Sequence, residues 1–211
     1  MELLVKQTMR VKDMFLKNEK YLLNFTIIIF FLIFFKNIFA ADDKIKVVNY
    51  LNSLRNFSAS FIQNDGLGLS EGKVYIGEKR VRADYLSPTK ILIILDDDKA
   101  MYYNYDLEED DFFNPKNTNA WFFYDIFRNP FFFEDSLLEL ENNELILKKT
   151  GIDSNKQNFV IKVFFEKNPL VLRAVEVFVN NEFLRLSIYN HNYNEDFDDD
   201  LFKLINPKFL N

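Results

Sequence analysis

The chain has 211 residues and no cysteine, and its 26 basic and 32 acidic residues give a formal net charge of −6. The absence of cysteine excludes disulfides and thiolate chemistry, and the only histidine, His191, excludes a metal site built from several histidines. The acidic balance argues against nucleic acid as a partner, because phosphate binding requires a basic surface. With 25 phenylalanines and only 5 glycines, the chain is expected to have a large apolar interior or an apolar surface that is used.

Residues 1–40 have the pattern of a secretory signal peptide. A leader with several Lys and Arg residues precedes Tyr21–Phe35, a run of 15 residues without a charge, and Ala40 follows. An uncleaved membrane anchor is the alternative, but a spanning helix needs about 20 apolar residues. We therefore expect cleavage near Ala40 and export across the inner membrane. Met14 is an alternative start to Met1. No cysteine follows the leader, so the protein is not expected to be a lipoprotein itself.

Residues 41–211 suit a single domain of 171 residues. This part carries 20 basic and 29 acidic residues, a net charge of −9. Its first element is a predicted helix over Asp42–Asn56, whose apolar residues recur at near-helical spacing. They are Ile45, Val48, Leu51 and Leu54. Short strands are then expected at Phe57–Gln63, Lys73–Ile76, Arg80–Tyr85, Ile91–Leu95 and Ala100–Tyr105.

The middle of the chain is predicted to be helical rather than extended. Thr118–Phe127 is too densely apolar for strand alternation, and Pro130 would stop a helix there. Phe131–Leu138 is expected to form a second short helical piece. Strands and a final helical turn follow at Glu144–Lys148, Phe159–Glu166, Val171–Val179, Phe183–Tyr189 and Asp200–Leu204. Asn180-Asn181 is a candidate two-residue hairpin turn.

The predicted fold is mainly β. Many short strands at roughly 10-residue spacing are typical of an antiparallel sheet that curls. Period-two alternation gives this sheet one apolar and one polar face, and Phe57, Ala59 and Phe61 share the apolar face of the first strand. The helical material is too little to cover both faces. We therefore expect an α+β fold: an unclosed antiparallel β half-barrel with an N-terminal helix and a helical lid.

Sequence fragments spread over the mature chain carry a family resemblance. The first block combines Leu54, Phe57, Ala59, Phe61 and Gln63 with a strand that starts at Gly72 and with Arg82-Ala83-Asp84-Tyr85 before Pro88. Later fragments at 95–106, 170–176, 185–189 and 201–207 follow in matching order. Together they resemble the outer-membrane lipoprotein carrier family, LolA.

The resemblance implies a LolA-like fold and a function that is not enzymatic. Family members are periplasmic chaperones that take triacylated lipoproteins from an inner-membrane lipoprotein-releasing ABC transporter. They pass them to an outer-membrane acceptor protein, or to the membrane, and hold the acyl chains under the lid. Exposing one acyl chain of ~16 methylenes to water costs about 13 kcal/mol, so an apolar concavity suits this task. The alternative is a periplasmic lipid- or lipoprotein-sensing or phospholipid-binding domain on the same fold. A monomer is expected.

Aromatic residues are the candidates for acyl-chain binding. Seven Trp and Phe side chains within residues 121–133 exceed what one short helix can bury against a sheet, and exposed clusters of this kind mark binding sites. Ordinary packing against the sheet is the alternative interpretation. The predicted cargo-binding residues are Phe57, Phe61, Tyr75, Tyr85, Trp121, Phe122, Phe127 and Phe131.

Two arginines are candidates for a latch on the lid. The resemblance implies an Arg, usually followed by Pro, just after the Gly-led strand, and that Arg bonds the lid backbone. Here Gly77-Glu78-Lys79-Arg80 takes that place, with no Arg-Pro pair. Arg80 or Arg82 is expected to take over the latch role, and the alignment does not decide between them.

The sequence predicts no catalytic residue, metal site or cofactor. Acidic runs at Asp96–Asp98, Glu108–Asp111 and Asp198–Asp200 lack the spacing of a calcium loop and are expected to be solvated loops or turns. His191 lies outside any recognisable nucleophile motif and is expected at the surface near a strand end.

Overall fold

The computed structural model describes residues 42–153 and 156–210. The predicted signal peptide and both candidate start residues lie outside this part of the chain, so these expectations stay predictions. The described residues from Lys44 onward form one compact unit. Among the helices that are described, none combines the length and the apolar character that crossing a membrane would require.

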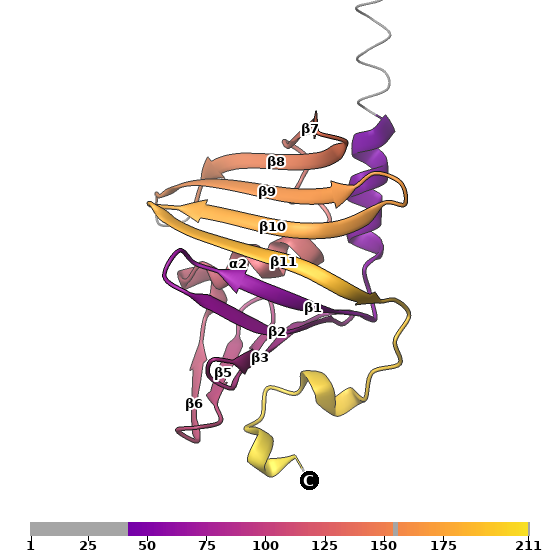
Figure 1. The fold of residues 1–211 in the computed structure, drawn as a ribbon. Coiled ribbons are helices and arrows are strands. Elements are labelled where there is room, and N and C mark those ends of the chain that lie inside the picture. The colour runs from indigo at the N-terminus through magenta and orange to yellow at the C-terminus, as the bar shows by residue number, and fades with distance from the viewer. Residues whose placement is uncertain (1–41, 154–155, 211) are drawn as a thin grey trace, which may run out of the picture. The chain divides into compact units, whose positions relative to one another are not determined.

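The described strands form one antiparallel sheet of eleven strands (Figure 1). They are β1 (Phe57–Asn64), β2 (Leu69–Ile76), β3 (Val81–Ser87), β4 (Ile91–Leu95), β5 (Ala100–Asn104), β6 (Glu109–Phe113), β7 (Leu137–Glu141), β8 (Glu144–Ile152), β9 (Asn158–Glu166), β10 (Val171–Val179) and β11 (Glu182–Asn192). Their order is β6-β5-β4-β3-β2-β1-β11-β10-β9-β8-β7, so two meanders meet where β1 pairs with β11. The sheet ends in β6 and β7, which confirms the predicted unclosed architecture.

The connection between the two edge strands crosses the inner face of the curled sheet. It contains the short 3-10 helix η1 (Pro115–Asn117), the helix α2 (Ala120–Arg128) and a series of turns before β7. Figure 1 shows α2 behind β10, β11 and β1. Phe122, Ile126 and Phe127 are its buried residues, so an amphipathic helix covers the sheet as the density of apolar residues predicts. We call α2 and the following turns, residues 120–136, the lid.

A second helix, over residues 42–53, precedes β1. Val47 and Leu51 are fully buried and Leu54 follows just beyond the helix, whereas Ile45 is 58% exposed. The buried stripe is therefore offset from the predicted one, although its spacing is helical. These residues join one core with α2 and the inner-face residues of β1, β9 and β10. Inner residues of β9 alternate strictly with half-exposed ones, which is the period-two pattern of a sheet with one covered face.

Two strands replace other structures that the sequence predicts. Phe131–Leu138 is not a helical piece: turns lead to β7, which begins at Leu137. Glu108–Asp111 is not a loop, because Glu109–Asp111 belong to β6. Both strands lie at edges, where one side of the backbone is unpaired and charged side chains reach water. An edge strand can therefore carry several charged residues, and these charges obscure the alternation of apolar and polar residues by which a strand is recognised in the sequence.

Asparagine pairs form two of the hairpin turns. Asn180 and Asn181 both adopt positive φ angles, 46° and 68°, and join β10 to β11, which confirms the predicted turn. Asn142 and Asn143 do the same between β7 and β8, with φ angles of 47° and 70°. Positive φ at both central residues is the geometry of a type I′ turn, which matches the twist of the flanking strands.

Candidate functional site

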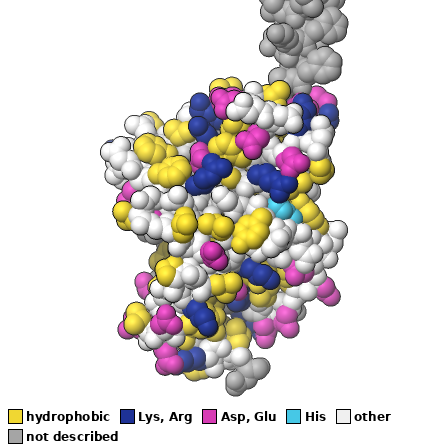
Figure 2. Space-filling view, viewed as in Figure 1, with side chains coloured by type: hydrophobic (Ala, Val, Ile, Leu, Met, Phe, Trp, Pro, Cys, Tyr) yellow, Lys and Arg dark blue, Asp and Glu magenta, His cyan; other side chains and the backbone are white. Residues whose placement is uncertain are grey.

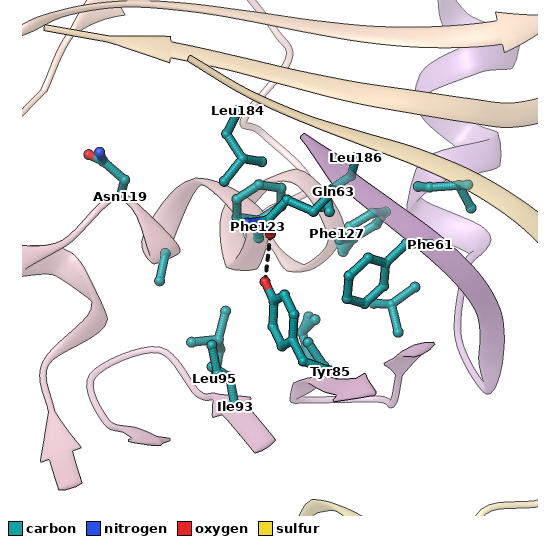
Figure 3. A pocket seen from close by; sticks show the side chains of 15 residues that line it. Phe61, Gln63, Tyr85, Ile93, Leu95, Asn119, Phe123, Phe127, Leu184 and Leu186 are labelled. Atoms are coloured by element: carbon teal, nitrogen blue, oxygen red, sulfur yellow. Dashed lines mark hydrogen bonds between the residues drawn. The ribbon is translucent and has the colours of Figure 1, made fainter. Parts of the chain in front are cut away.

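An apolar cavity of about 220 Å³ lies between the inner face of the sheet and α2 (Figure 3). Twelve of its fifteen lining side chains are apolar. They come from β1 to β4, α2 and β11: Phe61, Val74, Val81, Ala83, Ile93, Leu95, Ala120, Phe123, Phe127, Leu184, Leu186 and Ile188. Strand alternation brings them together, because every second residue of a strand faces inward.

Three polar side chains also reach this cavity. The Tyr85 hydroxyl donates a hydrogen bond of 2.7 Å to Oε1 of Gln63 in its interior. Burial raises the pKa of Tyr85 to about 12, as expected for a phenol in apolar surroundings. The third polar residue, Asn119, lies at the N-terminal end of α2 and donates a 3.0 Å hydrogen bond to Glu182.

The cavity continues into a more open groove of about 610 Å³. Asn119, Phe123 and Leu184 line both spaces. The groove is also bounded by residues of the β1–β2 loop and of the β10–β11 turn. We call the junction at Asn119 the mouth, since the apolar cavity meets the groove there, at one end of the sheet.

The C-terminal end of α2 is fastened by Arg128. Its guanidinium donates to the backbone oxygens of Leu54, Gly77 and Glu78. Burial, together with the charge of Arg55, lowers the pKa of Arg128 to about 10, and Nε has no hydrogen-bond partner among the described residues. A desolvated cation that is held by carbonyls rather than a carboxylate is costly, so this contact fixes the helix end at the expense of electrostatic strain.

A lysine holds the turns that follow α2. Nζ of Lys44, on the N-terminal helix, donates to the backbone oxygens of Glu134 and Ser136 at 2.8 and 2.7 Å. Ser136 is itself buried, and its hydroxyl donates to the Phe133 oxygen at 2.6 Å. The lid therefore has two cationic fastenings on its C-terminal side. We call the Arg128 and Lys44 contacts the cationic clamp.

The N-terminal end of the lid is held by exposed contacts. The Asn119–Glu182 hydrogen bond crosses the mouth at the surface. Lys116 of η1 pairs with Asp97 at 2.8 Å, and both side chains are more than half exposed. Exposed ion pairs of this kind contribute little to stability. The two ends of the lid thus differ in how strongly they are fastened.

Five of the eight predicted cargo residues lie in or beside the cavity. Phe61, Tyr85 and Phe127 line the cavity. Phe57 and Phe122 are buried in the core beside it, with Phe57 packed near His191 and Tyr193 and Phe122 against Phe159.

The other three predicted cargo residues lie away from the cavity. Tyr75 is on the outer face of β2, where its ring packs on Phe197 of the C-terminal segment. Trp121 lines a separate recess beside η1, and Phe131 is 69% exposed. Tyr75 alternates with the inward-facing neighbours Val74 and Ile76, so strand periodicity already places it on the opposite face.

Arg80 and Arg82 hold the C-terminal segment instead of contacting the lid. Arg80 donates to the Phe202 oxygen at 2.9 Å and pairs with Asp96. Arg82 donates to the Leu201 oxygen at 2.6 Å and pairs with Asp84. Within the described residues, the arginine that joins the lid to the β2–β3 turn is Arg128, which lies on the lid itself. The direction of the bond is therefore opposite to the one that the family resemblance implies.

Several lining residues were missed by the sequence analysis. Phe123 belongs to the predicted aromatic cluster but was not among the predicted cargo residues, and Leu184, Leu186 and Ile188 form the inner row of β11. The alternation of apolar and polar residues in β11 could have indicated its inner row, but sequence alone does not show that β11 lies beside β1.

The outer face of the sheet differs from the cavity. There, apolar side chains are interspersed with charged ones (Figure 2), which contrasts with the continuous apolar lining of the cavity.

The described residues contain no cluster of acidic or histidine side chains that could hold a metal ion. His191 is half-buried rather than a surface residue: Nε2 lies 2.6 Å from the Leu172 oxygen, and the ring stacks on Tyr193. Burial lowers the pKa of His191. These contacts give it a packing role at the end of β11.

Comparisons with known proteins found one relative by sequence and several solved structures that are similar to this chain. An uncharacterized protein of Rickettsia prowazekii, RP864, is 25% identical over 164 residues, which are 77% of this chain and 76% of that protein. An uncharacterized conserved protein of Thermus thermophilus is similar in structure at a TM-score of 0.49 and 11% identity, over 77% of this chain and 93% of that one. The Pseudomonas aeruginosa MucA/MucB complex gives a TM-score of 0.44 at 9% identity, over 77% and 60% of the respective chains.

A family model covers most of the domain. The model for the outer membrane lipoprotein carrier protein LolA matches residues 52–205, from the end of the N-terminal helix to the C-terminal segment. The match includes all the strands, the lid and every residue that lines the cavity. The chain therefore belongs to the LolA family of outer membrane lipoprotein carrier proteins.

Proposed function

We propose that the domain is a periplasmic carrier that binds the acyl chains of lipoproteins released from the inner membrane and delivers them to the outer membrane. The observation that carries this proposal is the apolar cavity beneath α2, which continues through the mouth into an open groove. Burying a methylene group contributes about 0.8 kcal/mol, so such a lining would bind acyl chains without any covalent chemistry. The carrier role also fits the family to which the chain belongs.

The size of the cavity implies that the lid moves. A volume of about 220 Å³ is below the roughly 300–1,000 Å³ of pockets that bury a drug-sized ligand. Three long acyl chains need more space than this closed form has. The exposed contacts at the mouth are the ones that would break at least cost, whereas the cationic clamp keeps the C-terminal side of the lid in place. We therefore propose that the lid hinges at Arg128 and opens at Asn119.

Transfer then requires no energy source in the carrier. Moving an acyl chain from one apolar site to another is close to neutral in free energy, because the chain is removed from water in both. The proposed donor is a lipoprotein-releasing ABC transporter of the inner membrane, and the proposed recipient is an outer-membrane acceptor protein or the membrane itself. The carrier is expected to act as a monomer.

Co-purification tests this function. The mature protein, residues 41–211, is isolated from the periplasm of the cell that makes it and examined by native mass spectrometry. Bound triacylated lipoproteins are the expected result, and their loss from a variant with a filled cavity is the control. An empty protein with esterase activity would overturn the proposal.

A second candidate function is a periplasmic domain that binds phospholipid or senses lipids. It is favoured by the same small volume, because about 220 Å³ suits part of one acyl chain better than three. In the same experiment, this function predicts bound phospholipid and no lipoprotein. The two functions also differ in vesicle assays, since only the carrier should extract a triacylated lipoprotein from a membrane.

A further inference from the structure

A pair of hydrogen-bonded polar side chains lies inside the otherwise apolar cavity. Gln63 ends the inner row of β1, and Tyr85 stands on β3, across β2 from it. Their side chains point toward each other in Figure 3 and are joined by the 2.7 Å bond from the hydroxyl to Oε1. An apolar pair would contribute more to acyl-chain binding alone, so the polar pair calls for a ligand group that it could serve.

The pair has unused hydrogen-bonding capacity. A glutamine amide carries two N–H donors on Nε2, and within the described residues Nε2 has no hydrogen-bond partner. Because the Tyr85 bond occupies Oε1, it fixes the amide plane and leaves Nε2 as the group that is available to a ligand. The phenol is held in turn by the Phe61 ring, whose centroid lies 5.1 Å away in an edge-on arrangement. Residues of β1 and β3, together with the Phe61 ring, therefore preorganise one donor.

An acyl chain joined to glycerol or to an amine has one matching group. Its ester or amide carbonyl is an acceptor with no donor, and it lies at the boundary between the apolar tail and the polar head. We propose that the Gln63–Tyr85 pair binds this carbonyl oxygen through Gln63 Nε2 and so sets how deeply an acyl chain enters the cavity. This inference rests on the proposed function, because it assigns the polar end of the same ligand.

The test compares two probes that differ only at the carbonyl. One is a 1-monoacylglycerol and the other is the 1-O-alkylglycerol ether with the same number of chain atoms. Displacement of a fluorescent fatty acid from residues 41–211 gives both dissociation constants. A net hydrogen bond in such a site is expected to favour the ester by roughly three- to tenfold. In Gln63→Met, which keeps the length of the side chain, this preference should disappear: the ratio of the two dissociation constants should fall to about one, even if the more apolar lining binds both probes more tightly.

Two further variants keep the test decisive. Tyr85→Phe retains the ring and removes the bond that orients the amide, so the ester preference should fall part of the way. Gln157→Met makes the same substitution in the β8–β9 connection, away from the cavity, and should retain the full preference. The Gln63 side-chain amide resonance should also shift on addition of the ester and remain in place on addition of the ether.

The outcomes separate this inference from the proposed function. Equal affinity of the unmodified protein for ester and ether, or an ester preference that survives Gln63→Met, would overturn the role of the pair and leave acyl-chain binding intact. If neither probe binds, the carrier function fails and the assignment of the pair fails with it.

Discussion

The two ends of the lid are fastened by different physical means. At its C-terminal side, the half-buried Arg128 guanidinium and the Lys44 ammonium bind backbone oxygens that belong to distant parts of the chain. At its N-terminal end, Asn119 and Lys116 make exposed contacts with side chains. Partly buried hydrogen bonds from a charged donor cost more free energy to break than exposed ones, which exchange readily with water. This contrast is the basis for our proposal that one end of the lid serves as a hinge and the other as a gate.

Filling the cavity between these two ends should have the largest effect on binding. Ala83 lines the cavity, so Ala83→Phe places a ring where the acyl chain is expected. We predict that the affinity for a fluorescent fatty acid falls more than tenfold, as measured by titration. Ser187→Phe on the outer face of β11 is the control and should bind normally. If Ala83→Phe binds the fatty acid with unchanged affinity, the acyl chain does not bind in this cavity.

Removing the hinge should have the largest effect on stability. Arg128→Met deletes three hydrogen bonds from a charged donor but also relieves its desolvation, so we expect a net loss of about 2–3 kcal/mol. For a domain of this size, the melting temperature should fall by roughly 4–12 °C. Changing the exposed neighbour Arg55 to Met removes a charge that repels Arg128 but none of its hydrogen bonds, so this control should melt at or slightly above the temperature of the parent protein. If Arg128→Met has the same melting temperature as the parent protein, the cationic clamp does not hold the lid.

Loosening the gate should change kinetics rather than stability. Asn119→Ala removes the hydrogen bond to Glu182 across the mouth, and the expected stability change is below about 0.5 kcal/mol. A fluorescent fatty acid should nevertheless dissociate a few-fold faster in stopped-flow measurements, because the gate opens more often. Equal dissociation rates for Asn119→Ala and the parent protein would contradict an exit at this end.

The smallest expected effect lies outside the lid. Burial lowers the pKa of His191 in the folded protein, and the nearby Arg173 adds to this. The unfolded chain then binds more protons near and below pH 6.5, so stability should be unaffected above that pH and decline as the pH falls through it. Chemical denaturation between pH 5 and 8 should show this slope, and His191→Gln should reduce it.

The sequence predicts the sheet better than it predicts the lid fastenings. Alternation in β1 and the Asn180-Asn181 turn are local signals, so the strand faces and one hairpin could be predicted correctly. Charged residues hid the edge strands β6 and β7. Phe61, Tyr85 and Phe127 line the cavity as predicted, whereas Phe57, Trp121, Phe122 and Phe131 do not, because the sequence does not show which aromatic residues of the inner face and the lid border the space between them.

The fastenings were missed for a physical reason. Arg128 contacts residues 50 to 74 positions earlier, and Lys44 contacts residues 90 and 92 positions later. Their acceptors are backbone oxygens, which have no signature in the sequence. Arg80 and Arg82 were predicted as latch residues because they follow the Gly-led strand. In this chain, side chains at these positions donate hydrogen bonds to the C-terminal segment rather than to the lid.

Photo-crosslinking in cells tests the central claim, that acyl chains occupy the space under the lid. A photoreactive phenylalanine replaces Phe123, which lines both the cavity and the groove, or Phe178, which is 42% exposed on the outer side of β10. Irradiation should join the protein to acylated lipoproteins from position 123 and not from position 178. Crosslinks to lipoproteins from position 178 alone, or from neither position, would contradict the account.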